Sequence, residues 1–107
     1  MTEFRKTLPT NLYILKYRKP IPCNDLMKWG KWFENTHRRV RRTQINEHLF
    51  ISTVFLGIDH GWNDNLELFE TMVFKNGEGQ DCYRCDTWRN ALKQHWEIVR
   101  LVSNDRI

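Results

Sequence analysis

The segment HLFISTVFLGI, residues His48–Ile58, decides the fold. It is rich in β-branched and aromatic residues, which favour β-strands. Because side chains alternate along a strand, one face holds Phe50, Ser52, Val54 and Leu56, and the other holds Leu49, Ile51, Thr53 and Phe55. Both faces are largely apolar, so the segment is predicted to be a central strand that is covered on both sides.

Three more elements are predicted on the carboxyl-terminal side of this strand. After a polar loop over residues 59–65, Leu66–Phe74 is expected to form the next strand. The turn Asn76–Gly79 and a short returning strand over Gln80–Cys85 follow. Asp86 is predicted to cap a last helix. The apolar stripe of this last helix consists of Trp88, Ala91, Leu92, His95, Val99 and Val102.

Two elements are predicted directly before the central strand. Val40–Ile45 is expected to pair with it through a turn at residues 46–47. Before that strand, apolar residues at helical spacing predict a helix over about Asp25–Arg38. Either Asn24 or Asp25 is suited to cap this helix, because both side chains accept hydrogen bonds from backbone N–H groups.

The first quarter of the chain is predicted to hold one short strand, Asn11–Tyr17, which suits the edge of a sheet. Pro20 and Pro22 are expected to end its pairing, because proline lacks a backbone N–H. Residues 1–10 are expected to form a loosely ordered lead-in.

The predicted order β-α-β-β-β-(β)-α, with short turns between consecutive strands, indicates an α+β fold. We expect an antiparallel sheet of about four to five strands with two helices packed on it. The length of 107 residues suits a single domain, residues 1–107.

The formal charge of +4 conceals an uneven distribution. Residues 1–42 contain 11 Lys and Arg against three acids, whereas residues 43–107 contain six against ten. This placement predicts two distinct surfaces, at least one of which binds a partner.

The composition of the chain also indicates the cellular compartment in which we expect the protein. No stretch approaches the about 20 apolar residues that span a bilayer, and the first residues lack the apolar run of a signal peptide. Three cysteines, Cys23, Cys82 and Cys85, are an odd and sparse set for a secreted disulfide scaffold. We therefore expect a cytoplasmic protein with reduced thiols and no membrane contact.

Two polar residues fall on apolar faces that are predicted to pack together. Glu70 lies on the strand face of Met72 and Phe74, and His95 lies on the stripe of the last helix. An unpaired buried charge costs several kcal/mol, so a Glu70–His95 contact is predicted. Asp59 and His60 follow the central strand, at a position where loops often carry function.

Together these four residues offer the ligand types of a metal site or the groups of an acid–base pair. Three interpretations stay open: a structural bridge, a ligand- or nucleotide-binding site, and a catalytic site. Their spacing matches no known zinc or hydrolase pattern, so no metal, cofactor or catalytic residue is assigned.

Cys82 and Cys85 form a single Cys-x-x-Cys pair. Zinc normally takes four ligands, and nothing in the sequence brings Cys23 and a histidine to this pair. Partly exposed, reduced thiols are the expectation, and a zinc site is the alternative.

A basic run crosses the predicted helix–strand junction and comprises Arg38, Arg39, Arg41 and Arg42. The guanidinium fork fits phosphate or carboxylate, so the run is a candidate surface for nucleic acid or an acidic protein; the alternative is a solvated face. Because the run spans a junction, its four side chains need not share one face. Trp62, in the polar loop, is either a binding anchor or a lid that folds back on the sheet.

Two blocks, STVFLGIDH (Ser52–His60) and LFETMVF (Leu68–Phe74), are followed by a helix that bears His95. They resemble a small family of phage and prophage proteins of about this length. The resemblance runs from Pro20 through the last helix and implies a viral or mobile-element origin.

The expected function is that of a small phage-type accessory protein that binds a host protein or a nucleic-acid-handling complex, in host takeover or against host defence. The contact would use the basic half, the acidic region 59–86, or both, in the cytoplasm of an infected or lysogenic bacterium. One alternative is a small-ligand-binding, nucleotide-binding or metal-dependent enzyme that uses Asp59, His60, Glu70 and His95. A second is direct nucleic-acid binding through the Arg38–Arg42 run. Exposed strand edges also leave a homodimer open.

Overall fold

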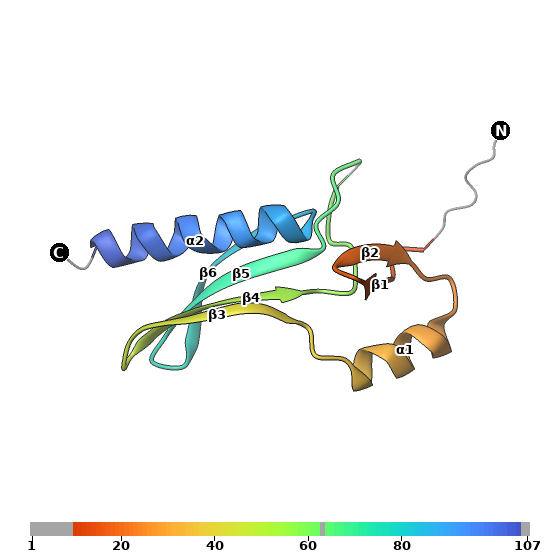
Figure 1. Ribbon diagram of the computed structural model, residues 1–107, viewed down its shortest axis with the longest axis horizontal. Coiled ribbons are helices and arrows are strands. Elements are labelled where there is room, and N and C mark those ends of the chain that lie inside the picture. The colour runs from red at the N-terminus through yellow and green to blue at the C-terminus, as the bar shows by residue number, and fades with distance from the viewer. Residues whose placement is uncertain (1–9, 63, 106–107) are drawn as a thin grey trace.

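The computed structural model describes residues 10–62 and 64–105. The chain order is β1 (Tyr13–Lys16), β2 (Lys19–Pro22), α1 (Leu26–Asn35), β3 (Arg39–Asn46), β4 (Leu49–Phe55), β5 (Phe69–Lys75), β6 (Glu78–Cys85) and α2 (Trp88–Asp105). The predicted α+β class is confirmed, with one antiparallel sheet of two strands and one of four (Figure 1). Apart from Thr10, the predicted lead-in lies outside the described residues.

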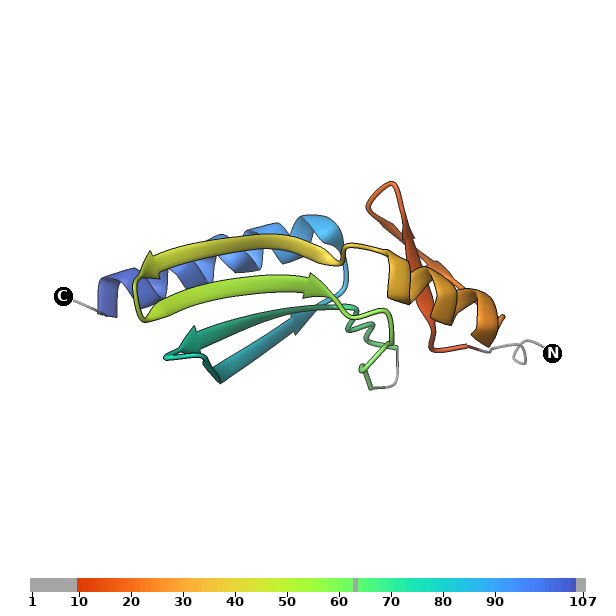
Figure 2. The same ribbon diagram turned by 90° about the horizontal axis from the view of Figure 1, so that it is seen from below.

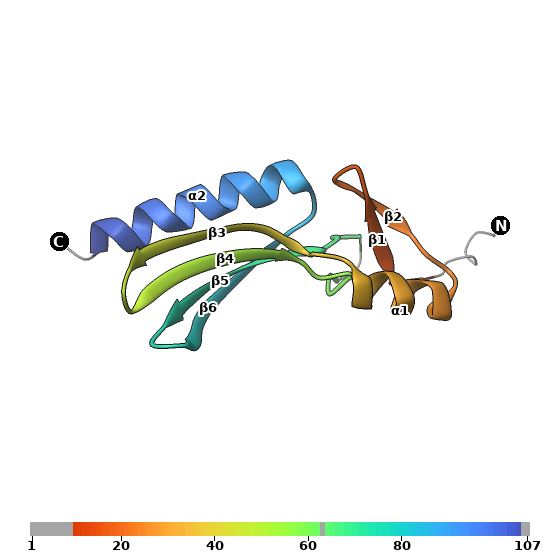
Figure 3. The ribbon, with the colours of Figure 1, turned by 60° about the horizontal axis from the view of Figure 1, so that its bottom comes forward.

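The four-stranded sheet is a meander of order β3-β4-β5-β6, and α2 packs along one of its faces (Figure 3). On β4, Ile51, Thr53 and Phe55 point toward α2 and are fully buried. The adjacent positions of β5 are Val73, Thr71 and Phe69, in register with those three residues. The central position predicted for the His48–Ile58 segment is therefore confirmed.

The N-terminal cap of α2 lies one residue later than predicted, at Thr87 instead of Asp86. Thr87 Oγ1 accepts a hydrogen bond from the Asn90 N–H (3.0 Å), so Thr87 caps the helix. Asp86 instead accepts from the Asn90 side-chain amide (2.9 Å). Ala91, His95 and Ile98 form the buried stripe that rests on the sheet.

The second face of the sheet carries no helix, contrary to the prediction that β4 is covered on both sides. No described element lies over Phe50, Ser52 and Val54 of β4 or over Glu70, Met72 and Phe74 of β5, and these side chains are only half-buried. Figure 2 views the sheet from the side opposite α2. We call this surface, with the adjoining side chains of β3 and β6, the open face.

The prediction fails here because α1 packs elsewhere. The helix packs mainly on β1 at the far end of the molecule, and it meets the four-stranded sheet through Trp32, whose ring lies edge-on to Phe55 with centroids 5.9 Å apart. Asp25 caps it, as expected, by accepting from the Lys28 N–H (3.1 Å). The Trp29 indole donates to the carbonyls of Tyr13 (3.0 Å) and Gly57 (3.1 Å), and so ties α1 to β1 and to the segment after β4.

β1 and β2 form a hairpin, although Pro20 and Pro22 were predicted to end the pairing. The prolines alternate with Ile21 and Cys23, and the Cys23 N–H donates to the Leu12 carbonyl (2.8 Å). The hydrogen-bonded positions of β2 therefore fall between the prolines, whose nitrogens face away from β1. No helix among the described residues is long and apolar enough to cross a membrane.

Candidate functional site

The four polar candidates do not form one site. Glu70 and His95 were predicted to touch, but they lie on opposite sides of the sheet. Along β5, Phe69, Thr71 and Val73 face α2, so Glu70 points to the open face. The helix that carries His95 covers the other face, so this prediction is wrong.

His95 bridges α2 to two strands through threonine hydroxyls. Its Nε2 lies 2.8 Å from Thr43 Oγ1 and its Nδ1 lies 2.8 Å from Thr53 Oγ1, which in turn lies 2.6 Å from Thr71 Oγ1. Burial, and secondarily the charge of Arg41, lower the pKa of His95 to about 4. The imidazole is therefore neutral near pH 7, and a neutral ring donates at one nitrogen and accepts at the other. This arrangement is a structural bridge.

Glu70 is paired across the open face with the neighbouring strand. Its Oε2 lies 3.1 Å from both Nε and Nη2 of Arg84 and accepts from the Cys82 thiol (3.0 Å). Burial and this hydrogen bond raise the pKa of the Cys82 thiol. The carboxylate is thus held by its neighbours on β6.

Asp59 closes the loop that follows β4. Its Oδ1 accepts from the N–H groups of Gly61 (2.8 Å) and Glu67 (2.9 Å). A Cβ at Gly61 would lie 1.5 Å from the Asn65 carbonyl oxygen, so only glycine fits this turn. His60 is exposed beside it. Within residues 10–62 and 64–105, no three His, Cys, Asp or Glu side chains gather in a way that would hold a metal ion.

The two thiols of the Cys-x-x-Cys pair point in different directions. They are three positions apart on β6, and an odd spacing along a strand places side chains on opposite faces. Cys82 reaches Glu70 on the open face, whereas Cys85 packs against the core cluster of Phe55 and Phe69. Burial raises the pKa of Cys85 to about 11, with a further contribution from Asp86. The two sulfurs are therefore not placed to share one zinc ion.

The basic run is divided among three environments, as its position at a junction predicted. Arg38 Nη1 donates to the Phe55 carbonyl (3.0 Å), at the end of β4. Arg42 lies over the Phe50 ring on the open face, 4.0 Å from its centroid. Arg41 faces the α2 side, because a β-bulge between Arg39 and Arg41 shifts the alternation of β3.

The open face has an apolar centre between charged flanks. The rings of Phe50 and Phe74 stack across β4 and β5 with centroids 4.7 Å apart and planes 10° apart. One face of each ring is covered by the other ring, and the second face of Phe50 lies beneath the Arg42 guanidinium. Val54 and Met72 continue the apolar surface toward the Glu70–Arg84 pair.

The sequence carries a signal for this surface in the second apolar row of β4. Such a row predicts only that cover of some kind is favourable, and it does not show that the cover comes from the same chain.

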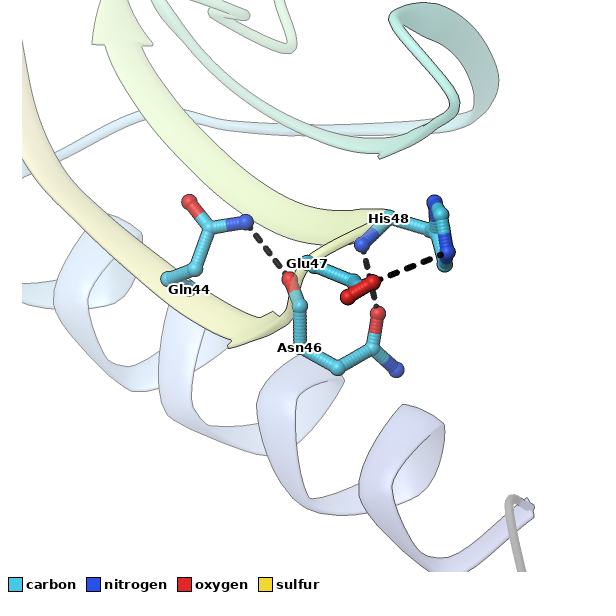
Figure 4. A network of polar contacts seen from close by, with 4 residues as sticks. All are labelled: Gln44, Asn46, Glu47 and His48. Carbon is cyan, nitrogen blue, oxygen red and sulfur yellow. Dashed lines mark hydrogen bonds and ion pairs between the residues drawn. The ribbon is translucent and has the colours of Figure 1, made fainter.

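Among the described residues, the loops at the two ends of the sheet do not bring side chains together into a metal-binding or catalytic group. Trp62 is 80% exposed, so it does not fold back on the sheet as a lid, which leaves the binding anchor of the two alternatives. At the other end, the β3–β4 turn is held locally (Figure 4): the Gln44 amide donates to the Asn46 carbonyl (2.6 Å), and the His48 N–H donates to Asn46 Oδ1 (2.7 Å). The exposed side chains of Glu47 and His48 lie side by side, with Oε1 and Nε2 3.5 Å apart.

A depression of about 650 Å³ lies along the outer surface of α1. Its lining comes only from residues 25–34, that is, from this helix and its cap. One helix supplies a single wall, and buried ligand sites need convergent walls. The depression therefore does not support the small-ligand alternative.

Comparison of the chain with protein-family models, curated proteins and solved structures finds no match.

Proposed function

We propose that this protein acts by binding a partner protein through the open face of its sheet. The observation that carries the proposal is the stacked Phe50–Phe74 pair, which stands with Val54 and Met72 on a sheet face that no described element covers. Contiguous exposed apolar surface with a charged rim is typical of interaction sites. In keeping with the phage-type resemblance, the proposed partner is a host protein or a nucleic-acid-handling complex in the cytoplasm of a bacterial host.

The charges of the open face favour an acidic partner over a second copy of the chain. Arg42 and Arg39 flank the apolar centre on β3, and Arg84 flanks it on β6, where Glu70 already pairs with it. Two copies placed face to face would bring these arginine rims together, which like-charge repulsion disfavours. An apolar partner surface rimmed by Asp or Glu would match both features.

No catalytic function is proposed. Asp59, Glu70 and His95 are each engaged in separate local contacts, so they offer no nucleophile–base pair within hydrogen-bond reach of each other.

The test is affinity capture from host lysate with the wild type and with Phe74→Asp. The matched control is Met27→Asp, which places the same charge on an apolar side chain of α1 that is 82% exposed. We expect one partner to be recovered by the wild type and by Met27→Asp and lost with Phe74→Asp. Nuclease treatment of the lysate distinguishes a protein contact from one bridged by nucleic acid.

Thermal melts monitored by circular dichroism check that Phe74→Asp is folded. If Phe74→Asp unfolds, Arg42→Glu is used in its place. This substitution reverses one charge of the rim at an exposed position and leaves the core unchanged. Recovery of the partner with both open-face variants would overturn the proposal. A dimer in sedimentation that Phe74→Asp dissociates would instead assign the face to a second copy.

A further inference from the structure

Exposed cations line one side of α2, away from the open face. Arg89, Lys93 and Arg100 are exposed and stand four and seven positions apart, so they project from one side of the helix. With a rise of 1.5 Å per residue, they span about 16 Å. Charges clustered along one side of a helix are the electrostatic footprint of nucleic-acid binders.

The neighbouring edge strand extends this row. Arg41 of β3 lies over the ring of Trp96, 5.1 Å from its centroid, and Trp96 remains 45% exposed. Trp96 stands three positions after Lys93 and four before Arg100, so it lies between the two cations. This row of cations therefore includes the accessible indole of Trp96 and, from β3, the guanidinium of Arg41.

The β1–β2 hairpin adds a cation where α2 begins. Arg18 is exposed at the tip of the hairpin and lies over Trp88, 5.2 Å from its ring centroid. We call Arg18, Arg41, Arg89, Lys93, Trp96 and Arg100 the α2 strip.

The cations of the α2 strip have no acidic partner among the described residues. The contacts found there between basic and acidic side chains join Arg84 to Glu70 and His48 to Glu47. Glu97 is the acid of the central turns of α2; it stands four positions after Lys93 and three before Arg100, so it borders the strip, but no ion pair joins it to either cation among the described residues. The strip therefore keeps five cations against this one neighbouring acid. The positive charge of the strip is therefore available to an external polyanion.

We propose that the α2 strip binds the phosphodiester backbone of a nucleic acid. The phosphates would contact Arg41, Arg89, Lys93 and Arg100, since arginine and lysine are the usual phosphate partners. The exposed part of the Trp96 indole would pack against a sugar or a base. This surface differs from the Arg38–Arg42 run of the sequence analysis, of which it includes only Arg41, and it does not depend on the open face.

The test is fluorescence anisotropy of the full chain with labelled single-stranded and duplex oligonucleotides over a range of salt concentrations. Four phosphate contacts predict a log–log salt slope of about −3 to −4 for a duplex and somewhat less for a single strand. The double variant Arg89→Ala, Lys93→Ala should reduce the slope by about 2, one unit per lost contact, and should weaken binding about tenfold at moderate salt.

The matched control is Lys28→Ala with Lys31→Ala, which removes two exposed lysines from α1 and changes the net charge equally. It should leave the salt slope unchanged. Equal weakening by the control would overturn the proposal, because binding would then follow net charge alone. Absence of binding at low salt would overturn it too, as would competition by polyglutamate at the same charge concentration, which would assign the strip to acidic proteins.

Discussion

At the residue scale, His95 makes the stability of the fold depend on pH. Its pKa is about 4 in the folded protein, against about 6.5 in an unfolded chain. Between these values the unfolded chain binds the proton more readily, so the free energy of unfolding falls as the pH drops from 6.5 to 4. The full shift corresponds to a loss of about 3 kcal/mol. Urea titrations at several pH values between 7 and 4 measure this loss.

The variant His95→Gln separates this effect from the protonation of carboxylates. Glutamine offers a donor and an acceptor but does not titrate, so stability should decline less steeply with falling pH than in the wild type. If the variant does not fold, the imidazole resonances of wild-type His95, followed by NMR, give the pKa directly. A midpoint near 6.5 would contradict the prediction.

At the element scale, the β1–β2 hairpin turn holds two non-glycine residues in the left-handed region. Tyr17 has a φ of 54° and Arg18 a φ of 69°, which costs about 1–2 kcal/mol per residue. Asn-Gly is the preferred pair for such a turn. We expect Tyr17→Asn with Arg18→Gly to stabilise the protein by about 1 kcal/mol, after loss of the Arg18–Trp88 contact, worth about 0.5–1 kcal/mol. Thermal melts should show a rise of about 4–8 °C.

Arg18→Ala serves as the control for that hairpin. It removes the contact with Trp88 but leaves a strained residue in the turn, so it should melt below the wild type. A double variant no more stable than Arg18→Ala would show that the turn is not under strain.

The elements were predictable where the signal was local. Alternation located β4 and β5 and correctly placed Glu70 with Met72 and Phe74, because strand parity needs no distant partner. The side of the sheet that α2 covers was not predictable, since both rows of β4 are apolar. The prediction placed α2 on the wrong face of the sheet. It therefore predicted a Glu70–His95 contact and left no face uncovered.

The polar candidates show the same limit. His95 stood out as an anomaly on an apolar stripe, but its partners Thr43 and Thr53 are ordinary strand residues with no signal of their own. Long-range pairs of this kind are decided by packing. Asp59 differs, because its partners Gly61 and Glu67 are close in sequence and lie within or just after the polar loop predicted over residues 59–65.

In the whole molecule, the uneven distribution of charge along the chain corresponds to particular surfaces and contacts. Some of the acids of residues 59–86 are used locally, as with Asp59 in its loop and Glu70 in its ion pair. Among the described arginines of the basic half, Arg39 and Arg42 lie on the open face, Arg18 and Arg41 belong to the α2 strip, and Arg38 is bound to the end of β4. The two proposed surfaces thus lie on opposite sides of one sheet, and a single molecule has room for a protein and a nucleic acid at once.

The hairpin and α1 join the sheet at the edge of the core, where the partly buried Tyr13, Leu15 and Trp32 pack against the cluster that contains Phe55 and Phe69. No residue of α1 is buried. The Tyr13 N–H donates to the Gly57 carbonyl (2.8 Å), which also accepts from the Trp29 indole. Elements with few buried contacts open at lower free energy than the core. We therefore expect backbone amides of α1 to exchange with solvent faster than those of Ile51 and Thr53.

The variant Trp29→Phe tests how the Trp29 hydrogen bonds to Tyr13 and Gly57 connect α1 to the rest of the molecule. It removes both indole hydrogen bonds but keeps an aromatic ring to stack on Phe33. At about 1 kcal/mol of net stability per hydrogen bond, amide exchange in β1 and α1 should accelerate by about five- to thirtyfold, while Ile51 and Thr53 keep their wild-type rates. Trp62→Phe, an exposed substitution, should change neither group. Equal acceleration at every amide would mean that the hairpin, α1 and the sheet open as one cooperative unit.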